Sequence, residues 1–206
     1  MKRFPRILVG AVAAAACTAS LAGTAGATPP STRQTGTGQT APAWAADAPA
    51  PLPGFHLILP GTAAAEVARA ALETFRFRNA HSNLCLEIRG DSTANGATAN
   101  QWSCNGSATQ AWISGSNSYG YTFTNANSSK CLEIRGDSTA NGATANQWAC
   151  NGSRTQAWYW YGRSDGSMYF RNVNSGKCLE ILSWGTGNGN PAGQWDCHYG
   201  NNQIWW

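Results

Sequence analysis

The chain has 206 residues, with 14 Lys and Arg against 10 Asp and Glu, and it contains 23 Gly and 10 Trp residues. The low charge argues against a nucleic-acid-binding surface, and the many Gly, Asn and Ser residues favour turns and strands over helices. His56, His81, His198 and the widely spaced cysteines lack metal-ligand spacing, so we expect no metal and no other cofactor.

The first 27 residues have the three-part layout of a secretory signal peptide. Lys2, Arg3 and Arg6 precede an apolar run, and small residues follow as far as Ala27, where we expect cleavage. The apolar run is about half of the roughly 20 residues that cross a bilayer, so we expect no transmembrane segment. The mature chain would then be secreted and extracellular. In an alternative interpretation Cys17 is a lipid-anchor cysteine, although the Leu that usually begins that motif is absent.

Residues 28–73 are rich in Pro, Thr, Ala and Gly and show no apolar period. This composition is typical of a disordered or extended linker that buries too little surface to fold alone. Within the linker, residues 62–73 (TAAAEVARAALE) contain good helix formers and predict a short helix.

Residues 74–206 consist of three copies of one unit, at about 74–119, 120–166 and 167–206. Intervals of 46 and 47 residues separate Phe77, Phe123 and Phe170. The segments CLEIRGDSTANGATANQWSC and CLEIRGDSTANGATANQWAC differ at one position of 20, whereas CLEILSWGTGNGNPAGQWDC keeps 11 of the 20. The unit has therefore been duplicated, and the third copy has diverged.

Each copy has the pattern of a small assembly of hairpins. Alternating segments such as TFTN precede a Cys-Leu-Glu-Ile run, an Asn-Gly turn begins at Asn95, Asn141 or Asn188, and a run ending in Gln-Trp follows. One copy is too small to bury a core, but three copies can close around a shared axis and bury their aromatic residues together. We therefore expect a single all-β domain.

Cleavage leaves six cysteines, an even number that favours disulfides in an oxidising compartment. Their equal spacing suggests one symmetric pairing within each copy, which would contribute about 3 kcal/mol for each closed loop. The pairs are Cys85 with Cys104, Cys131 with Cys150, and Cys178 with Cys197. A cyclic pairing that links neighbouring copies, such as Cys104 with Cys131, is equally symmetric, and the spacing alone leaves it open.

At this point the sequence resembles the ricin B-type lectins and the similar carbohydrate-binding module family 13, whose mark is a threefold Gln-x-Trp repeat. The triplets are Gln110-Ala111-Trp112, Gln156-Ala157-Trp158 and Gln203-Ile204-Trp205, in register with the cysteine pairs. The resemblance covers residues 75–206 and implies a β-trefoil, sugar binding and disulfides within each copy. It also implies that each triplet Gln orients an acidic residue, while the triplet Trp residues belong to the core.

A sugar offers hydroxyls that need fixed hydrogen-bond partners and an apolar C–H face that suits an aromatic ring. Each copy supplies an acid after its first cysteine and a Trp two residues before its second. The acids are Glu87, Glu133 and Glu180, and the indoles are Trp102, Trp148 and Trp195. We therefore predict up to three shallow sugar-binding pockets. In the alternative interpretation each Glu caps a local backbone turn and each Gln-Trp pair packs under the neighbouring copy.

Position by position, no copy matches the family completely. The family's polar contact four residues before the second cysteine falls on Asn100 and Asn146 but on Gly193 in the third copy, and the amide before the triplet Gln falls on Asn202 only. All three acids are Glu where the family usually has Asp. Trp184 has no counterpart in the other copies, and it either adds a stacking face to the third pocket or covers the core edge.

The predicted partner is a polysaccharide or glycan, and we expect no enzymatic activity. Catalysis of hydrolysis needs a pair of acidic groups a few ångströms apart, whereas these three Glu residues lie in separate copies. The alternative function is a protein-interaction or inhibitor module, since a fold does not by itself fix a function.

Overall fold

The computed structural model describes residues 40–60 and 74–206. The predicted signal peptide, Cys17 and the short helix predicted for residues 62–73 lie outside the described residues.

Each copy contributes one short antiparallel hairpin that begins with its Cys-Leu-Glu-Ile segment. In chain order these are β2 (Cys85–Ile88) with β3 (Ala99–Trp102), β6 (Cys131–Ile134) with β7 (Ala145–Trp148), and β10 (Cys178–Ile181) with β11 (Ala192–Trp195). The predicted Asn-Gly turns lie between the paired strands, where Gly96, Gly142 and Gly189 have φ of 79°, 81° and 83°. Glycine suits these positions because other residues rarely adopt a positive φ.

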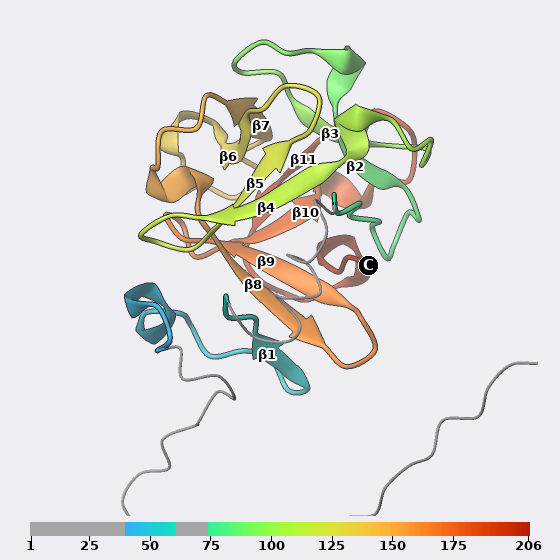
Figure 1. Cartoon of the computed structure of the whole chain (residues 1–206). Helices are drawn as coiled ribbons and strands as arrows, with labels where there is room; N and C mark the ends of the chain where they lie inside the picture. The colour runs from blue at the N-terminus through green and yellow to red at the C-terminus, as the bar shows by residue number, and fades with distance from the viewer. Residues whose placement is uncertain (1–39, 61–73) are drawn as a thin grey trace, which may run out of the picture. The chain divides into compact units, whose positions relative to one another are not determined.

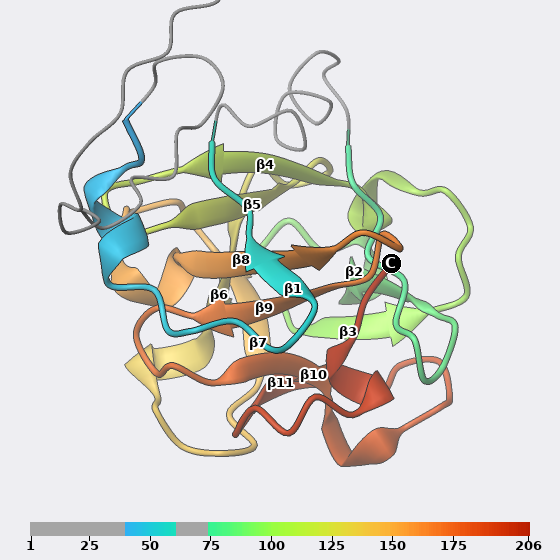
Figure 2. The same ribbon diagram turned by 90° about the horizontal axis from the view of Figure 1, so that it is seen from below.

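Four longer strands join the hairpins. These are β4 (Trp112–Ser116), β5 (Tyr121–Asn125), β8 (Trp158–Arg163) and β9 (Met168–Asn172). One sheet has the order β11-β10-β9-β8-β5-β6-β7, with β4 beside β5 and β1 (Phe55–Leu57) beside β8, while β2 and β3 form a separate pair. The strands wrap around one core, as Figures 1 and 2 show.

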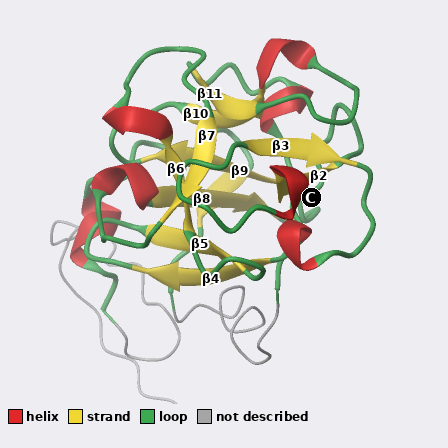
Figure 3. Ribbon diagram, turned by 90° about the horizontal axis from the view of Figure 1, so that it is seen from above, coloured by secondary structure: helices red, strands yellow, loops and turns green. Residues whose placement is uncertain are grey.

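The remaining elements are single turns of 3-10 helix, which Figure 3 shows in red beside the strands. After the first strand of each hairpin come η2 (Arg89–Asp91), η4 (Arg135–Asp137) and η6 (Leu182–Trp184). Before each Gln-x-Trp triplet come η3 (Ala108–Gln110), η5 (Arg154–Gln156) and η7 (Asn201–Gln203), and η1 (Ala43–Ala46) lies near the start of the described chain.

Three phenylalanines meet at the centre of the core, one from each copy. The ring centroids of Phe77, Phe123 and Phe170 lie 4.9–5.1 Å apart in edge-to-face pairs, a favourable arrangement for aromatic rings. Around them the triplet indoles are fully buried, and each donates its N–H to the backbone carbonyl of a leucine in its own copy, over 3.1–3.3 Å. The prediction that Trp112, Trp158 and Trp205 belong to the core is confirmed.

The disulfides close within each copy. They join Cys85 to Cys104, Cys131 to Cys150 and Cys178 to Cys197. The symmetric pairing within copies is therefore confirmed, and the cyclic alternative is wrong. Each bond ties the start of one hairpin strand to the chain just beyond the end of its partner.

The copies are also joined to one another in a closed ring by their Asn-Gly turns. Each Asn side-chain oxygen accepts a backbone N–H from the end of the next copy's second hairpin strand. The three bonds join Asn95 to Ala149, Asn141 to Asp196 and Asn188 to Ser103, over 3.0, 3.0 and 2.8 Å. The first copy thus holds the second, the second holds the third and the third holds the first.

The prediction of a linker is wrong for residues 40–60, which we call the N-terminal strap. Strand β1 of the strap pairs with β8, as Figure 2 shows, and Trp44, Phe55 and Ile58 are buried. The hydroxyl of Tyr161 donates to the carbonyl of Pro49 over 2.7 Å. The strap is ordered because a few large side chains dock on the trefoil, although its composition shows no regular apolar period.

Candidate functional site

Each hairpin places its Glu and its exposed Trp on the same face. In β6 and β7, Glu133 pairs with Asn146 and Cys131 pairs with Trp148. Since side chains alternate along a strand, residues two apart point to the same side. We call the Glu, the Trp two residues before the second cysteine, the triplet Gln and their surroundings the first, second and third sites, one in each copy.

The indoles at these sites are exposed and the carboxylates are recessed. Trp102, Trp148 and Trp195 are each 42% exposed, in contrast to the triplet indoles of the core. The corresponding Glu residues are only 3–7% exposed. An exposed indole beside a recessed acceptor offers a flat apolar surface and a fixed polar contact at one place.

The carboxylate of the second site is held by two side-chain amides. Gln156 donates to Oε2 of Glu133 over 2.9 Å, and Asn146 donates to Oε1 over 3.2 Å. The second site forms a hollow of about 360 Å³ that Trp148 and Asp137 also line. The first site repeats these bonds from Gln110 and Asn100 to Glu87, over 3.1 and 3.4 Å. In both copies the Glu is bonded to side-chain amides, so the interpretation of these Glu residues as backbone caps is wrong.

Burial raises the pKa of Glu87 above its ordinary value. The hydrogen bonds from Gln110 and Asn100 lower the pKa in part, and the nearby charge of Asp91 adds to the increase. These opposing effects follow from the same geometry, since burial disfavours the charged form and amide donors favour it.

The third site holds its carboxylate differently. Gln203 donates to Oε2 of Glu180 over 2.9 Å, and Nε2 of His198 lies 3.2 Å from the same oxygen. The backbone N–H of Gly200 donates to Nδ1 of His198 over 3.1 Å, so Nδ1 is an acceptor and Nε2 carries the proton. His198 therefore donates to Glu180 through Nε2. In this copy Gly193 replaces the Asn that bonds Oε1 in the other two, and His198 is the second donor to the carboxylate, on Oε2.

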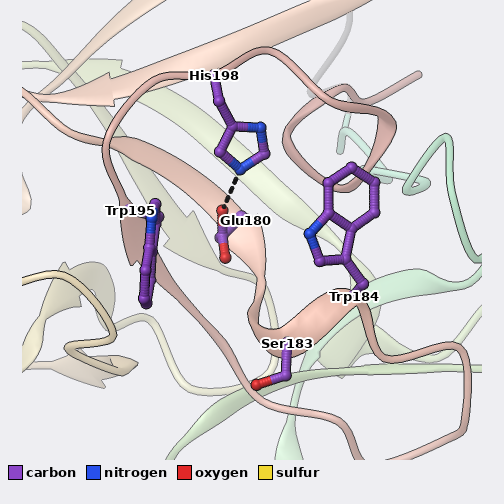
Figure 4. Close-up of a pocket in the computed structure, with 5 residues that line it drawn as sticks. All are labelled: Glu180, Ser183, Trp184, Trp195 and His198. Carbon is purple, nitrogen blue, oxygen red and sulfur yellow. Dashed lines mark hydrogen bonds and ion pairs between the residues drawn. The ribbon is translucent and has the colours of Figure 1, made fainter.

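The third site is a hollow of about 400 Å³ lined by five residues, which Figure 4 shows. Trp195 and Trp184 lie on opposite sides of Glu180 in that view, with His198 above it and Ser183 below. Trp184 is 48% exposed and lines the hollow. Of its two predicted roles, the structure therefore favours the additional wall of the third pocket.

The structure shows the hydrogen bonds of the predicted site residues, whereas their contacts with sugar stay predictions. Gln110, Gln156 and Gln203 donate to the carboxylates, as their predicted orienting role requires, and their part in sugar binding stays a prediction. Asn100 and Asn146 are buried and brace the acids, and their direct contact with sugar stays a prediction. Asn202 is also buried and donates to the carbonyl of Ile181 over 3.2 Å, so its sugar contact stays a prediction as well.

Sequence reasoning missed His198 in the third site and Asp137 in the second. His198 directly follows the second cysteine, where the other copies have Asn105 and Asn151, so an alignment of the copies would have placed it at the site. Asp137 lines the second hollow from a backbone with φ of 53°, and a rare conformation of this kind has no clear sequence signal.

Within the described ranges 40–60 and 74–206, no group of three or more His, Cys, Asp or Glu residues is arranged to hold a metal ion. In the same part of the chain, we find no helix with the length and apolar character that crossing a bilayer requires.

A sequence profile of the ricin-type beta-trefoil lectin domain matches residues 73–205. The chain belongs to this family. The comparison with curated proteins found no match. Among solved structures, this ricin-type domain is similar to ThreeFoil, a designed protein with threefold symmetry. The identity is 28%, the TM-score is 0.61, and the match covers 64% of this chain and 95% of ThreeFoil.

Two natural proteins extend the comparison of this ricin-type domain. The exo-beta-1,3-galactanase 1,3Gal43A from Clostridium thermocellum is 27% identical with a TM-score of 0.63, and the match covers 66% of this chain but only 30% of the galactanase. A ricin B-like lectin from Macrolepiota procera, solved with lactose, is 17% identical with a TM-score of 0.56, over 66% of this chain and 94% of that lectin. The latter likeness shows the shared β-trefoil fold.

Proposed function

We propose that this chain is a secreted, non-catalytic lectin that binds carbohydrate through up to three shallow sites, one in each copy. The observation that carries the proposal is the pairing of a recessed carboxylate with an exposed indole on the same face of each hairpin. The carboxylate can accept hydrogen bonds from sugar hydroxyls, while the indole can cover the apolar C–H face of the ring. The amides that hold each carboxylate keep it in place before the sugar arrives.

The similar proteins support this proposal and suggest first ligands. The Macrolepiota procera lectin was solved with lactose, and the enzyme from Clostridium thermocellum is a galactanase. Both names point to galactose-containing glycans, so we propose that class as the first to test on this chain.

Non-catalytic function is supported by the hydrogen bonds of His198. Ser183, His198 and Glu180 line one hollow, and a Ser, His and acid together are the components of a hydrolytic triad. A triad needs a free histidine nitrogen beside the serine hydroxyl. Here Nε2 bonds to Glu180 and Nδ1 accepts from Gly200, so neither nitrogen is free to activate Ser183.

Secretion is supported by the three disulfides, because such bonds persist in oxidising compartments. The predicted signal peptide is consistent with the same location. In that setting each shallow site should bind a monosaccharide with a Kd in the millimolar range, about 4 kcal/mol. Three sites on one domain would then bind a polysaccharide or a cell surface more tightly through avidity.

The test is a glycan array probed with the full chain and with the triple variant W102A/W148A/W195A. We expect the wild type to bind a set of glycans that free sugar displaces, and the triple variant to lose at least about tenfold in signal. The control is Trp206→Ala, which removes an indole of similar exposure, 46%, that does not line the second or third hollow. If the triple variant folds and still binds the same glycans, the sites are misassigned.

The alternative function, a protein-interaction or inhibitor module, predicts a different outcome. Binding to a protein partner would persist in saturating free sugar and would survive loss of the three indoles. Binding of that kind, without any glycan signal, would favour the alternative.

A further inference from the structure

The third site is built from different residues than the first and second. The first two copies agree with each other, and the third differs, at positions that include five at or beside the third site. The replacements are Arg89 and Arg135 by Leu182, Asp91 and Asp137 by Trp184, Asn100 and Asn146 by Gly193, Asn105 and Asn151 by His198, and Ser107 and Ser153 by Gly200.

These replacements fit one another in space. A Cβ added at Gly200 would collide with the indole of Trp184, so the loss of the serine side chain makes room for that ring. A Cβ added at Gly193 would lie 2.6 Å from the backbone carbonyl oxygen of Ala143 and 2.8 Å from Cδ1 of Leu182, so the glycine suits both the neighbouring backbone and the new leucine. The replacements in the third site are therefore sterically compatible with one another, and they leave room for the indole of Trp184.

Trp184 is held firmly although it is half exposed. Its ring stacks on His198 with centroids 5.6 Å apart and planes 21° apart, and the ring of His81 meets it edge-on at 5.2 Å. Its backbone has φ of 54°, close to the 52° and 53° of Asp91 and Asp137. The third copy thus presents an aromatic ring from the turn where the first two present a carboxylate.

The wall formed by Trp184 changes what the hollow can contact. Besides Trp148, the second hollow is lined by Asp137 and Arg135, whose polar groups suit hydroxyl groups. In the third hollow the indole of Trp184 takes the position of Asp137, and an indole suits C–H surface. Among the described residues, Glu180 is the only Asp, Glu, Lys or Arg that lines that hollow, so an uncharged ligand fits it best.

The orientation of the two indoles indicates the size of that ligand. Figure 4 shows Trp195 edge-on and Trp184 closer to face-on, with Glu180 between them, so the two rings are not parallel. One flat pyranose ring cannot stack on both. Two consecutive sugar rings can, because the glycosidic bond lets the second ring lie in a different plane from the first.

We propose that the third site binds two consecutive rings of an uncharged oligosaccharide, whereas the first and second sites each hold one ring. The proposal rests on the proposed function as a lectin. The first ring lies on Trp195 and donates a hydroxyl to Oε1 of Glu180, an oxygen that receives no hydrogen bond from any residue in the described ranges. The second ring packs against Trp184.

The test uses full chains in which only one kind of site remains intact. Variant W102A/W148A retains the third site, and variant W102A/W195A retains the second. Titration calorimetry compares galactose with lactose and with β-1,3-galactobiose, and glucose with cellobiose. We expect the third-site chain to bind a disaccharide about five- to tenfold more tightly than its monosaccharide, since an added ring contact contributes on this scale. For the second-site chain we expect less than about a twofold difference.

The matched variant is Trp184→Asp in the third-site chain, because Asp occupies the same backbone conformation in the first two copies. It should abolish the gain for disaccharides, so that a disaccharide and its monosaccharide bind this variant with Kd values within about twofold of each other. Trp184→Asn is the second variant should Asp destabilise the fold, since Asn also tolerates a positive φ.

The outcomes separate the two proposals. Equal disaccharide gains in the two single-site chains, or a gain that survives both Trp184 variants in folded protein, would overturn the two-ring site while leaving the lectin function intact. Failure of every sugar to bind even the wild-type chain, on the calorimeter and on the array, would contradict the lectin function itself.

Discussion

The N-terminal strap should contribute measurably to stability, and Trp44 is its anchor. The indole of Trp44 is 5% exposed and packs against the rings of Tyr121 and Tyr159, with centroids 5.7 and 6.1 Å away. A buried Trp removes roughly 150–250 Å² from water, worth about 4–6 kcal/mol at about 25 cal/mol per Å². The substitution Trp44→Ala in a rigid site would therefore cost about 3–5 kcal/mol.

The strap can also detach, and this sets an upper limit on the loss. Once the strap has detached from β8, the loss of Trp44 has no further effect on stability. The free energy of unfolding of the variant therefore cannot fall by more than the net free energy with which the strap docks. Ordering 21 residues offsets much of the burial. We therefore expect Trp44→Ala to lower the free energy of unfolding by about 2–3 kcal/mol. A chain that lacks residues 28–60 should lose slightly more.

Urea unfolding followed by far-UV circular dichroism, with the disulfides intact, measures both losses. Ala46→Ser, an exposed position in the same helical turn, is the control and should change stability by less than about 0.5 kcal/mol. Glycan binding in native buffer should remain, since no strap residue lines the second or third hollow. If the chain without the strap unfolds at the same urea concentration as the full chain, the docking of Trp44 contributes nothing and the reasoning fails.

Two further predictions concern pH. Burial raises the pKa of Glu87, so on acidification this carboxylate should become protonated at a higher pH than an ordinary Glu. The first site should then lose its sugar affinity at that higher pH. Sugar titrations of a chain that carries W148A/W195A, from pH 7 to pH 4, measure this loss. Unchanged affinity across that range would contradict it. Burial raises the pKa of Tyr169 from 10.0 to about 12, so the folded state holds this proton more strongly than the unfolded state does. The stability from this group is present below pH 10 and is lost as the pH rises toward 12, and urea midpoints of the wild type and Tyr169→Phe should converge over that interval.

Much of the fold followed from the repeated sequence. The core indoles were predicted from their place in the Gln-x-Trp triplets, and the exposed indoles from their place two residues before the second cysteine. Trp112 accordingly begins β4 and is fully buried, whereas Trp102 ends the second strand of a hairpin and is exposed. The disulfide pairing needed more than spacing, since the cyclic scheme has the same symmetry. Hydrogen-bonded strand pairs decide it, because Cys85 lies opposite Trp102, two residues from Cys104.

The docking of the strap and the role of His198 were missed for different physical reasons. Trp44 docks through a few irregular contacts on strands more than 70 residues later, and neither its neighbours nor any local period indicates this. An alignment of the copies places His198 at the site, but a histidine stands there in one copy only, so the threefold pattern does not indicate its role. Its role depends on the N–H of Gly200, which is a backbone group without a sequence signal of its own.

The closed ring of Asn-Gly turns makes the order of the copies along the chain unimportant for their association. Every copy supplies one side-chain amide oxygen and receives one in the same place, so each carries both halves of the contact. Three separate peptides of one copy could therefore assemble as a homotrimer, whereas two fused copies would leave one turn and one strand end unsatisfied. A fold of this kind can grow from a single short gene by triplication, and each copy can afterwards change its own binding residues while the shared contacts stay the same.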